Sequence, residues 1–307
     1  MDPYYTITGP RPDLAAIEVN PPEGYIGSKI VPTVNVADKT GTIYYNDVTA
    51  DVAAQTGRST VTAPNSTTIA TTSTTFTCAE AISRGKIAPD EVKAMGGIAK
   101  ADMVGTKFAK RNVLNAIEAA IAAVTTGSTA DATFDAAKFL GQSQTALDAV
   151  RLYYGKTTLL GATITLKRMV QAMLADDTFG PMLSRIVSGT SPSVATQGVN
   201  FSAWMNALAM LLGVDQVLAG DDTVWNDGDN ANKVVIGKFD DGSEELVHKY
   251  EPVFARNYLF MPDGANPWFV ESIGDRLTKA NVYDAAVWYN VVTLNTSAIY
   301  VFDGVPS

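Results

Sequence analysis

The strongest hydrophobic pattern in the chain runs from Ile98 to Val124. Alanine is frequent in this stretch and proline is absent. The larger apolar side chains recur three or four positions apart, at Val104, Phe108, Val113, Leu114, Ile117, Ile121 and Val124. At about 1.5 Å per residue, such a helix extends roughly 40 Å. We therefore predict one long helix that crosses a whole domain and ends at Gly127 and Ser128.

Shorter patterns predict a mixture of helices and strands around this helix. Before it, we expect Ala79–Gly97 to form a short helix, a break at Pro89 and a second helical turn. After it, the patterns predict helices over 134–154, 167–175 and 202–212, strands over 157–166 and 214–218, and loops over 179–201 and 219–233. The remainder favours strands over 234–239, 245–258, 268–272, 281–293 and 297–302, with a hairpin turn at Asn295 and Thr296. The pattern indicates an α+β fold.

The segment Ile30–Thr77 has a different character. It opens with two strand-like pieces joined at Asp38–Gly41, and twelve of the nineteen residues in Ser59–Thr77 are Ser or Thr. These residues favour extended backbone but lack the large apolar side chains of a core strand. Two paired limbs would reach roughly 65 Å, and a lone two-stranded ribbon is marginal in water. We expect a long hairpin that another copy of the protein covers, because the rest of the chain is poorly placed to do so.

The first 29 residues read as an extended arm. Five prolines prevent a continuous helix, at positions 3, 10, 12, 21 and 22. The N-terminus lacks the basic and apolar pattern of a signal peptide. No apolar run is long enough to span a membrane.

Composition narrows the classes of function. The chain has 307 residues, of which 46% are hydrophobic and 18% charged, as in a folded protein. A net charge of −9 disfavours a surface that grips nucleic acid phosphates. The single cysteine, Cys78, excludes an internal disulfide framework and is expected to be a small, partly buried side chain. We expect a soluble intracellular protein.

Residues that could carry catalysis are few, and a structural role fits each of them better. His248 is the only histidine and lies in an expected strand, so with Cys78 it cannot build a zinc site of the usual composition. A Ser–His–Asp arrangement stays open, because its members meet only in space. Gly155-Lys156-Thr157 is similar to the end of a phosphate-binding loop, but Val150 stands where that motif needs a glycine.

A structural role is also the better interpretation of the acidic and aromatic clusters. The loop Asp221–Asp229 lacks EF-hand spacing, which leaves a solvated loop or a nonstandard calcium site at Asp221, Asp222, Asp227 or Asp229. The pairs Asp240-Asp241 and Glu244-Glu245 are adjacent, so on a strand their members point to opposite faces. The late aromatics are expected to form the core of a sheet packed on the long helix: Trp268, Phe269, Tyr283, Trp288, Tyr289, Tyr300 and Phe302. The sequence thus predicts no catalytic, cofactor-binding or metal-binding residue.

The order of these parts resembles the major capsid proteins of tailed bacteriophages, which have the Hong Kong 97-type coat fold. GSKIVPTVNVADKTGTIYY is similar to the start of the family's long loop, and LLGVDQVLAGD to the segment before its axial strands. DAAVWYNVVTLNTSAIYVFDG is similar to the closing strands. The resemblance covers nearly the whole chain, and its specificity lies in the order of the motifs.

The resemblance implies a division of the chain. Met1–Lys29 would be the N-terminal arm and Ile30–Thr77 the extended loop. Cys78–Ala149 with Met261–Ser307 would form the peripheral domain, with the long helix as its spine, and Val150–Phe260 the axial domain.

The resemblance also implies a function. The chain would be a structural protein of the virion, made in the host cytoplasm and not an enzyme, that self-assembles through hexamers and pentamers into an icosahedral shell. The shell would enclose double-stranded DNA without sequence-specific binding, with portal and scaffolding or decoration proteins as partners, no cofactor and no membrane. Because the chain opens with its arm, we expect no scaffolding segment to be removed. No Lys–Asn cross-link is assigned, since Lys39 is the only lysine of the loop.

Two alternatives remain open. An encapsulin-like nanocompartment would keep the fold and store an enzyme cargo, although the proline-rich arm disfavours it. An acidic carbohydrate-processing enzyme would instead be a monomer with a carboxylate-lined cleft and a Thr-rich linker.

Overall fold

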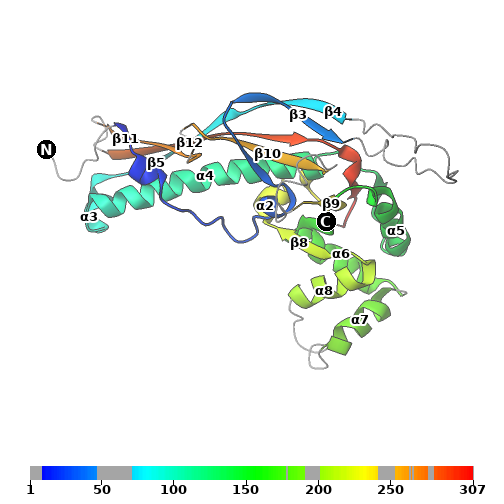
Figure 1. The fold of residues 1–307 in the computed structure, drawn as a ribbon. Helices are drawn as coiled ribbons and strands as arrows, with labels where there is room; N and C mark the ends of the chain where they lie inside the picture. Colours follow the sequence, from blue (N-terminus) through cyan, green and yellow to red (C-terminus); the bar gives the residue numbers. More distant parts are fainter. Residues whose placement is uncertain are drawn as a thin grey trace, which may run out of the picture.

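The fold is organised around one long helix. The structure, a computed structural model, describes residues 9–46, 71–177, 179–190, 201–240, 253–262, 264, 266–275 and 280–306. Helix α4, Ile98–Thr126, confirms the predicted long helix. Figure 1 shows a sheet along one side of α4, and a second sheet with helices α5 to α8 near the C-terminal end of α4.

The first sheet has six strands. They are β1 (Gly9–Pro10), β2 (Thr33–Val36), β5 (Ala79–Ile87), β10 (Ala255–Phe260), β11 (Phe269–Asp275) and β12 (Ala280–Thr293). The long strand β12 pairs with β5, β10 and β11, all antiparallel. Strand β5 lies along one edge of β12. Strands β11 and β10 lie one after the other along the opposite edge. Strand β2 adds to β10 in parallel.

The second sheet has five strands in the order β6-β13-β9-β7-β8. Their bounds are β6 Ala132–Thr133, β13 Ile299–Asp303, β9 Val234–Phe239, β7 Lys156–Ala162 and β8 Gln216–Gly220. The helices near this sheet are α5 (Phe139–Val150), α6 (Thr163–Ala175), α7 (Phe179–Thr190), α8 (Phe201–Leu212) and α9 (Asp222–Trp225). One core lies between this sheet and α5 to α8, and another joins the sheet to α4 around Ile121 and Trp225.

The predicted hairpin is formed by β3 (Thr40–Asn46) and β4 (Thr71–Thr77), which pair from Thr40 opposite Thr77 to Asn46 opposite Thr71. It lies over the first sheet on the side opposite α4 (Figure 1). Phe76 of β4 stacks on Tyr258 of β10, with ring centroids 4.7 Å apart and planes 7° apart. The expectation that the chain itself could not cover the hairpin is therefore wrong for its described base.

Helix α4 approaches the first sheet unusually closely. Gly105 of α4 lies under the ring of Tyr283 on β12, and a Cβ atom built on Gly105 would be 2.2 Å from that ring. A Cβ on Gly85 of β5 would lie 2.5 Å from the carbonyl oxygen of Gly105. Glycine at both positions therefore sets the distance between helix and sheet.

Substituting valine for Gly105 should destabilise the fold by about 1 to 3 kcal/mol, because the added side chain must displace Tyr283 or the helix. The measurement is the free energy of unfolding in urea. Gly141→Ala in α5 is the matched control, since nothing lies within 4 Å of its Cβ position. The control should be neutral or stabilising by up to about 1 kcal/mol. Equal effects of the two substitutions would contradict the close-packing explanation.

Several predicted elements differ in the structure. Ala79–Ile87 forms β5, not a helix, because it pairs with β12 over nine residues; only Pro89–Ala94 is helical, as α3. The strand expected over 157–166 ends at Ala162, and helix α6 begins at Thr163. The loop expected over 179–201 contains helix α7, whose Phe179 and Leu183 are buried in the core.

The late strands differ as well. The hairpin expected at Asn295 and Thr296 does not form, since β12 and β13 belong to different sheets and a 3-10 turn, Thr296–Ala298, joins them. The strands on either side of Asp38–Gly41 are likewise in different sheets. The polar loop 219–233 contains α9 and a 3-10 turn, Gly228–Asn230.

The late aromatics divide among three places. Tyr283 packs on α4 as expected, whereas Phe302 belongs to the core of the second sheet. Trp288 lies beside the hairpin base, with the Lys39 Nζ atom 4.4 Å from its ring centroid.

Candidate functional site

The N-terminal segment Gly9–Ile30, called the arm below, lies along α4 (Figure 1). It contains only two single helical turns, α1 (Pro12–Ala15) and α2 (Gly27–Ile30), as its prolines lead one to expect. Leu14, Ile26 and Ile30 are buried against the body of the protein. Three charged side chains of α4 make polar contacts with the arm.

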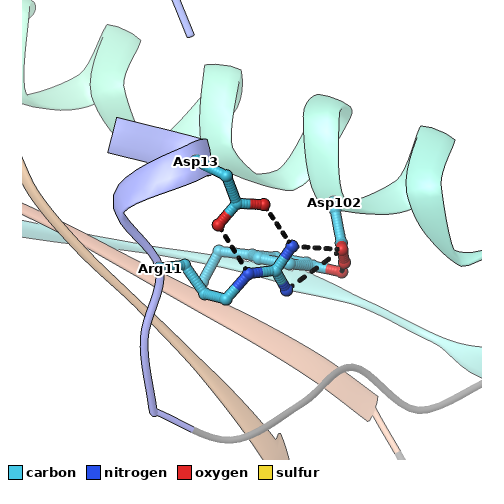
Figure 2. A network of polar contacts seen from close by, with 4 residues as sticks. Arg11, Asp13 and Asp102 are labelled. Carbon is cyan, nitrogen blue, oxygen red and sulfur yellow. Dashed lines mark hydrogen bonds and ion pairs between the residues drawn. The ribbon is translucent and has the colours of Figure 1, made fainter. Parts of the chain in front are cut away.

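The first contact is made by Asp102, in the first turns of α4. Its Oδ1 atom accepts a hydrogen bond of 2.6 Å from the Tyr283 hydroxyl, and its Oδ2 atom accepts from both terminal nitrogens of Arg11 at 3.3 Å. Figure 2 shows the Arg11 guanidinium between the carboxylates of Asp102 and Asp13. The Arg11 guanidinium, mainly through its hydrogen bonds, lowers the pKa of Asp13. This network joins the start of the arm to α4 and to β12.

The second contact is made by Lys110, which is 1% exposed. Its Nζ atom donates hydrogen bonds of 2.8 Å to the carbonyl oxygens of Ala15 and Ile17, and it lies 4.9 Å from the ring centroid of Trp268. Burial lowers the pKa of Lys110 to about 8. A buried ammonium is stabilised here by backbone dipoles and an aromatic face.

The third contact is made by Glu118, which is also buried. One carboxylate oxygen accepts from the backbone N–H groups of Ile26 and Gly27 at 2.7 and 3.0 Å and from the Trp225 indole at 2.8 Å. Burial raises the pKa of Glu118, although these three donors oppose the shift. Gly27 is required at this contact, because a Cβ atom there would lie 2.5 Å from the carboxylate.

These three residues are spaced eight positions apart, or about 12 Å along the helix axis. The arm residues that they contact follow in the same order, from Arg11 through Ala15 to Ile26 and Gly27. The arm therefore runs parallel to α4 and is fixed at regular intervals. The sequence reasoning missed these three residues. Their only regularity in the sequence is the spacing of eight positions.

Replacing Lys110 by methionine should change how stability depends on pH. The folded protein loses the Lys110 proton near pH 8, whereas an unfolded lysine keeps it to about 10.5. Between these values the unfolded state binds more protons, so the stability of the wild type relative to K110M should rise with pH. Below pH 8 the difference should be constant. Urea unfolding of both proteins across this range tests it, and a difference independent of pH would contradict it.

Part of the solvent face of α4 is apolar. Val104 and Phe108, expected in the buried stripe, are 47% and 56% exposed, and Met103 beside them is 47% exposed. The buried face instead contains Val113 and Ile121. The arm and α9 cover this side of the helix in its later turns, whereas in the first turns Met103, Val104 and Phe108 stay exposed.

Several residues weighed as chemical candidates make structural contacts. Asp221 caps the N-terminus of α9 by accepting from the Thr223 N–H, and Asp222 accepts from the Ile164 N–H at 2.7 Å. Lys156 begins β7. Within the described residues, no three His, Cys, Asp or Glu side chains gather as metal ligands would. His248, Asp241, Glu244 and Glu245 lie outside the described residues.

Cys78 is buried between the hairpin base and the first sheet. Its thiol lies 3.5 Å from the Tyr258 carbonyl oxygen, to which it donates. Burial raises the pKa of the thiol. The side chain therefore packs as a small hydrophobic group, as the sequence predicted.

Comparison with known proteins gives the fold a class. No family model and no curated protein matches the sequence. In structure, the chain is similar to a phage-related protein from Bordetella bronchiseptica RB50, with a TM-score of 0.65 and 16% identity over 98% of this chain and 100% of that chain. It is also similar to a capsid structure of the cyanophage P-SCSP1u, with a TM-score of 0.51 and 8% identity over 95% of this chain and 91% of that chain. The chain thus has the α+β capsid fold, the Hong Kong 97-type coat fold that the order of its parts predicted.

Proposed function

We propose that the chain is the major capsid protein of a tailed phage, which assembles through hexamers and pentamers into an icosahedral shell around the DNA genome. The observation that carries the proposal is the likeness of fold over 98% of this chain and all of the phage-related protein.

Two features of the chain support a role in assembly. The arm is an extended segment whose contacts include a few buried charges, and the described base of the hairpin packs on the first sheet. Segments of this kind suit contacts between copies, because each subunit holds several neighbours at once and no single contact has to be strong. Among the described residues, no helix combines the length and apolarity needed to cross a bilayer.

We also propose the division into domains that the resemblance implies. The complete N-terminal arm would be residues 1–29, which contain all but the last residue of the described arm Gly9–Ile30. The extended loop would be 30–77, the peripheral domain 78–149 with 261–307, and the axial domain 150–260. In this division β2 and β10 are strands that the loop and the axial segment contribute to the sheet of the peripheral domain. Portal, scaffolding or decoration proteins would be the other partners, and the shell would need no cofactor.

Negative-stain electron microscopy of the purified protein, with light scattering on the same sample, tests the proposal. Shells, tubes, or rings of five or six subunits are the expected result. A monomer even when the protein is co-expressed with its neighbouring genes would overturn it and would favour the enzyme alternative. A cargo enzyme among those genes, in place of phage terminase and portal, would favour the nanocompartment.

A further inference from the structure

The open face of α4 carries two parallel rows of side chains. Residues four apart on a helix form ridges, and Lys100, Val104 and Phe108 form one such ridge. The second ridge contains Met103, Lys107 and Arg111. All six side chains are exposed, so this face of the helix is open to solvent over about three turns.

The exposed charge on this helix is entirely positive. The only acidic residues of α4 are Asp102 and Glu118, and both are buried in contacts with the arm. The exposed charged residues of α4 are Lys100, Lys107 and Arg111. This is notable in a chain whose net charge is −9.

Two acids on the neighbouring elements have partners of their own. Asp13 of α1 forms its ion pair with Arg11 at 2.7 Å. Glu91 of α3 accepts a hydrogen bond from the Ala88 N–H at 2.9 Å. The face therefore combines exposed apolar side chains with cations that an acidic partner could approach.

Short helices of this chain already pack on the later turns of α4. Helices α2 and α9 pack on its later turns, where Ile26 and Ile30 meet Ile121 and the Trp225 indole reaches Glu118. Ridges and grooves spaced for a helix continue from there toward the N-terminal turns of α4.

We propose that the face formed by Lys100, Met103, Val104, Lys107, Phe108 and Arg111 is a docking site for an acidic amphipathic helix of a partner protein. The apolar stripe of that helix would cover Phe108, Val104 and Met103, and its flanking carboxylates would meet the three cations. Nucleic acid fits less well, because phosphates would meet the cations but leave three large apolar side chains in water. The proposal goes beyond shell formation and can be tested on the unassembled subunit.

The probe is a synthetic peptide of about 20 residues, designed as an amphipathic helix with leucines on one stripe and glutamates beside it. Its counterparts are the same peptide with lysine in place of each glutamate, and a scrambled peptide. Fluorescence anisotropy of the labelled peptides with the full chain should show binding of the acidic helix only. K107E/R111E should weaken that binding at least about tenfold and should instead bind the lysine peptide. F108A should also weaken it, since the stripe loses its largest contact.

The control variant K29E/R151E changes the charge equally at exposed cations away from this face and should bind like the wild type. Circular dichroism and thermal melting establish that each variant is folded. Equal binding of the scrambled peptide, or binding indifferent to K107E/R111E, would overturn the proposal. So would tighter binding of duplex DNA or of anionic vesicles that F108A leaves unchanged. Loss of assembly in K107E/R111E without any peptide binding by the wild type would identify the face as a contact between copies instead.

Discussion

Shortening the hairpin should abolish assembly while leaving the subunit folded. In the variant, residues 47–70 are replaced by Asn-Gly, a two-residue link that suits a tight turn between Asn46 and Thr71, which lie opposite each other. The base should persist, because Phe76 remains stacked on Tyr258 and Ile43 remains buried. A shorter loop also lowers the entropic cost of closing the hairpin, by about 0.6 kcal/mol for each halving of length. The variant should therefore be at least as stable as the full chain.

The measurement is sedimentation velocity with negative-stain microscopy, under conditions in which the full chain assembles. Complete loss of shells in a folded subunit is expected, because assembly would lose a contact that every copy makes. A second variant carries a Gly-Ser linker of unchanged length in place of 47–70. It shows whether assembly depends on the side chains of the segment or only on its length. Normal shells from the two-residue variant would show that the segment has no role in assembly.

The sequence predicted the long helix but not which side of it faces solvent. Its apolar positions cover more than one stripe, so Val104 and Phe108 looked equivalent to Val113 and Ile121. Gly105 decides which side of the helix faces the sheet, because its missing side chain lets the helix pack against Tyr283. With Gly105 on the sheet side, Val104 and Phe108 face solvent. Hydrophobic periodicity gives the existence of a helix, whereas its rotation depends on contacts with distant residues.

Strand β5 shows why short elements were misread. Ala79, Ala81 and the charged residues around them have good helix propensity, and this favoured a helix. The strand forms because nine of its residues pair with β12, about 200 positions later in the chain, and because Gly85 fits against the Gly105 carbonyl. Tertiary pairing outweighs local propensity here.

Helix α7 was missed for the opposite reason. Gly180, Pro181 and Ser184 are typical of loops, and they led us to expect one. Proline is tolerated in the first turn of a helix, since its missing N–H has no intrahelical acceptor there. The buried side chains of Phe179 and Leu183 then hold the helix on the core.

The residues that hold the arm could not have been predicted. Charged side chains in a helix are normally solvated, so Asp102, Lys110 and Glu118 gave no signal of burial. Their partners are mostly backbone atoms of the arm, such as the Ala15 carbonyl and the Ile26 N–H. Backbone groups leave no trace in side-chain patterns. The class of fold was nevertheless predictable, because it rests on the order of the elements.

Replacing Glu118 by alanine should release the C-terminal part of the arm. The substitution leaves three buried donors without an acceptor, namely the N–H groups of Ile26 and Gly27 and the indole of Trp225. At about 1 to 3 kcal/mol for each unsatisfied group, the expected loss of stability is roughly 3 kcal/mol or more. Hydrogen exchange at the Ile26 and Gly27 amides should accelerate strongly. Glu91→Ala, which removes an exposed acceptor from α3, is the control and should cost about 1 kcal/mol or less.

Replacing Glu118 by glutamine distinguishes the effect of the negative charge from the effect of the hydrogen bonds. It retains an oxygen for the donors but cannot ionise, so E118Q should lack the pH dependence of the wild type. Burial raises the pKa of Glu118 above its ordinary value of 4.5, and the folded state therefore binds the proton more tightly than the unfolded state. As pH rises from 4.5 through the raised pKa, the wild type should lose stability relative to E118Q and then reach a constant difference. If the wild type instead gained stability relative to E118Q over the same range, the three donors, and not burial, would determine the pKa of Glu118. The arm would then be held more firmly at neutral pH than in acid.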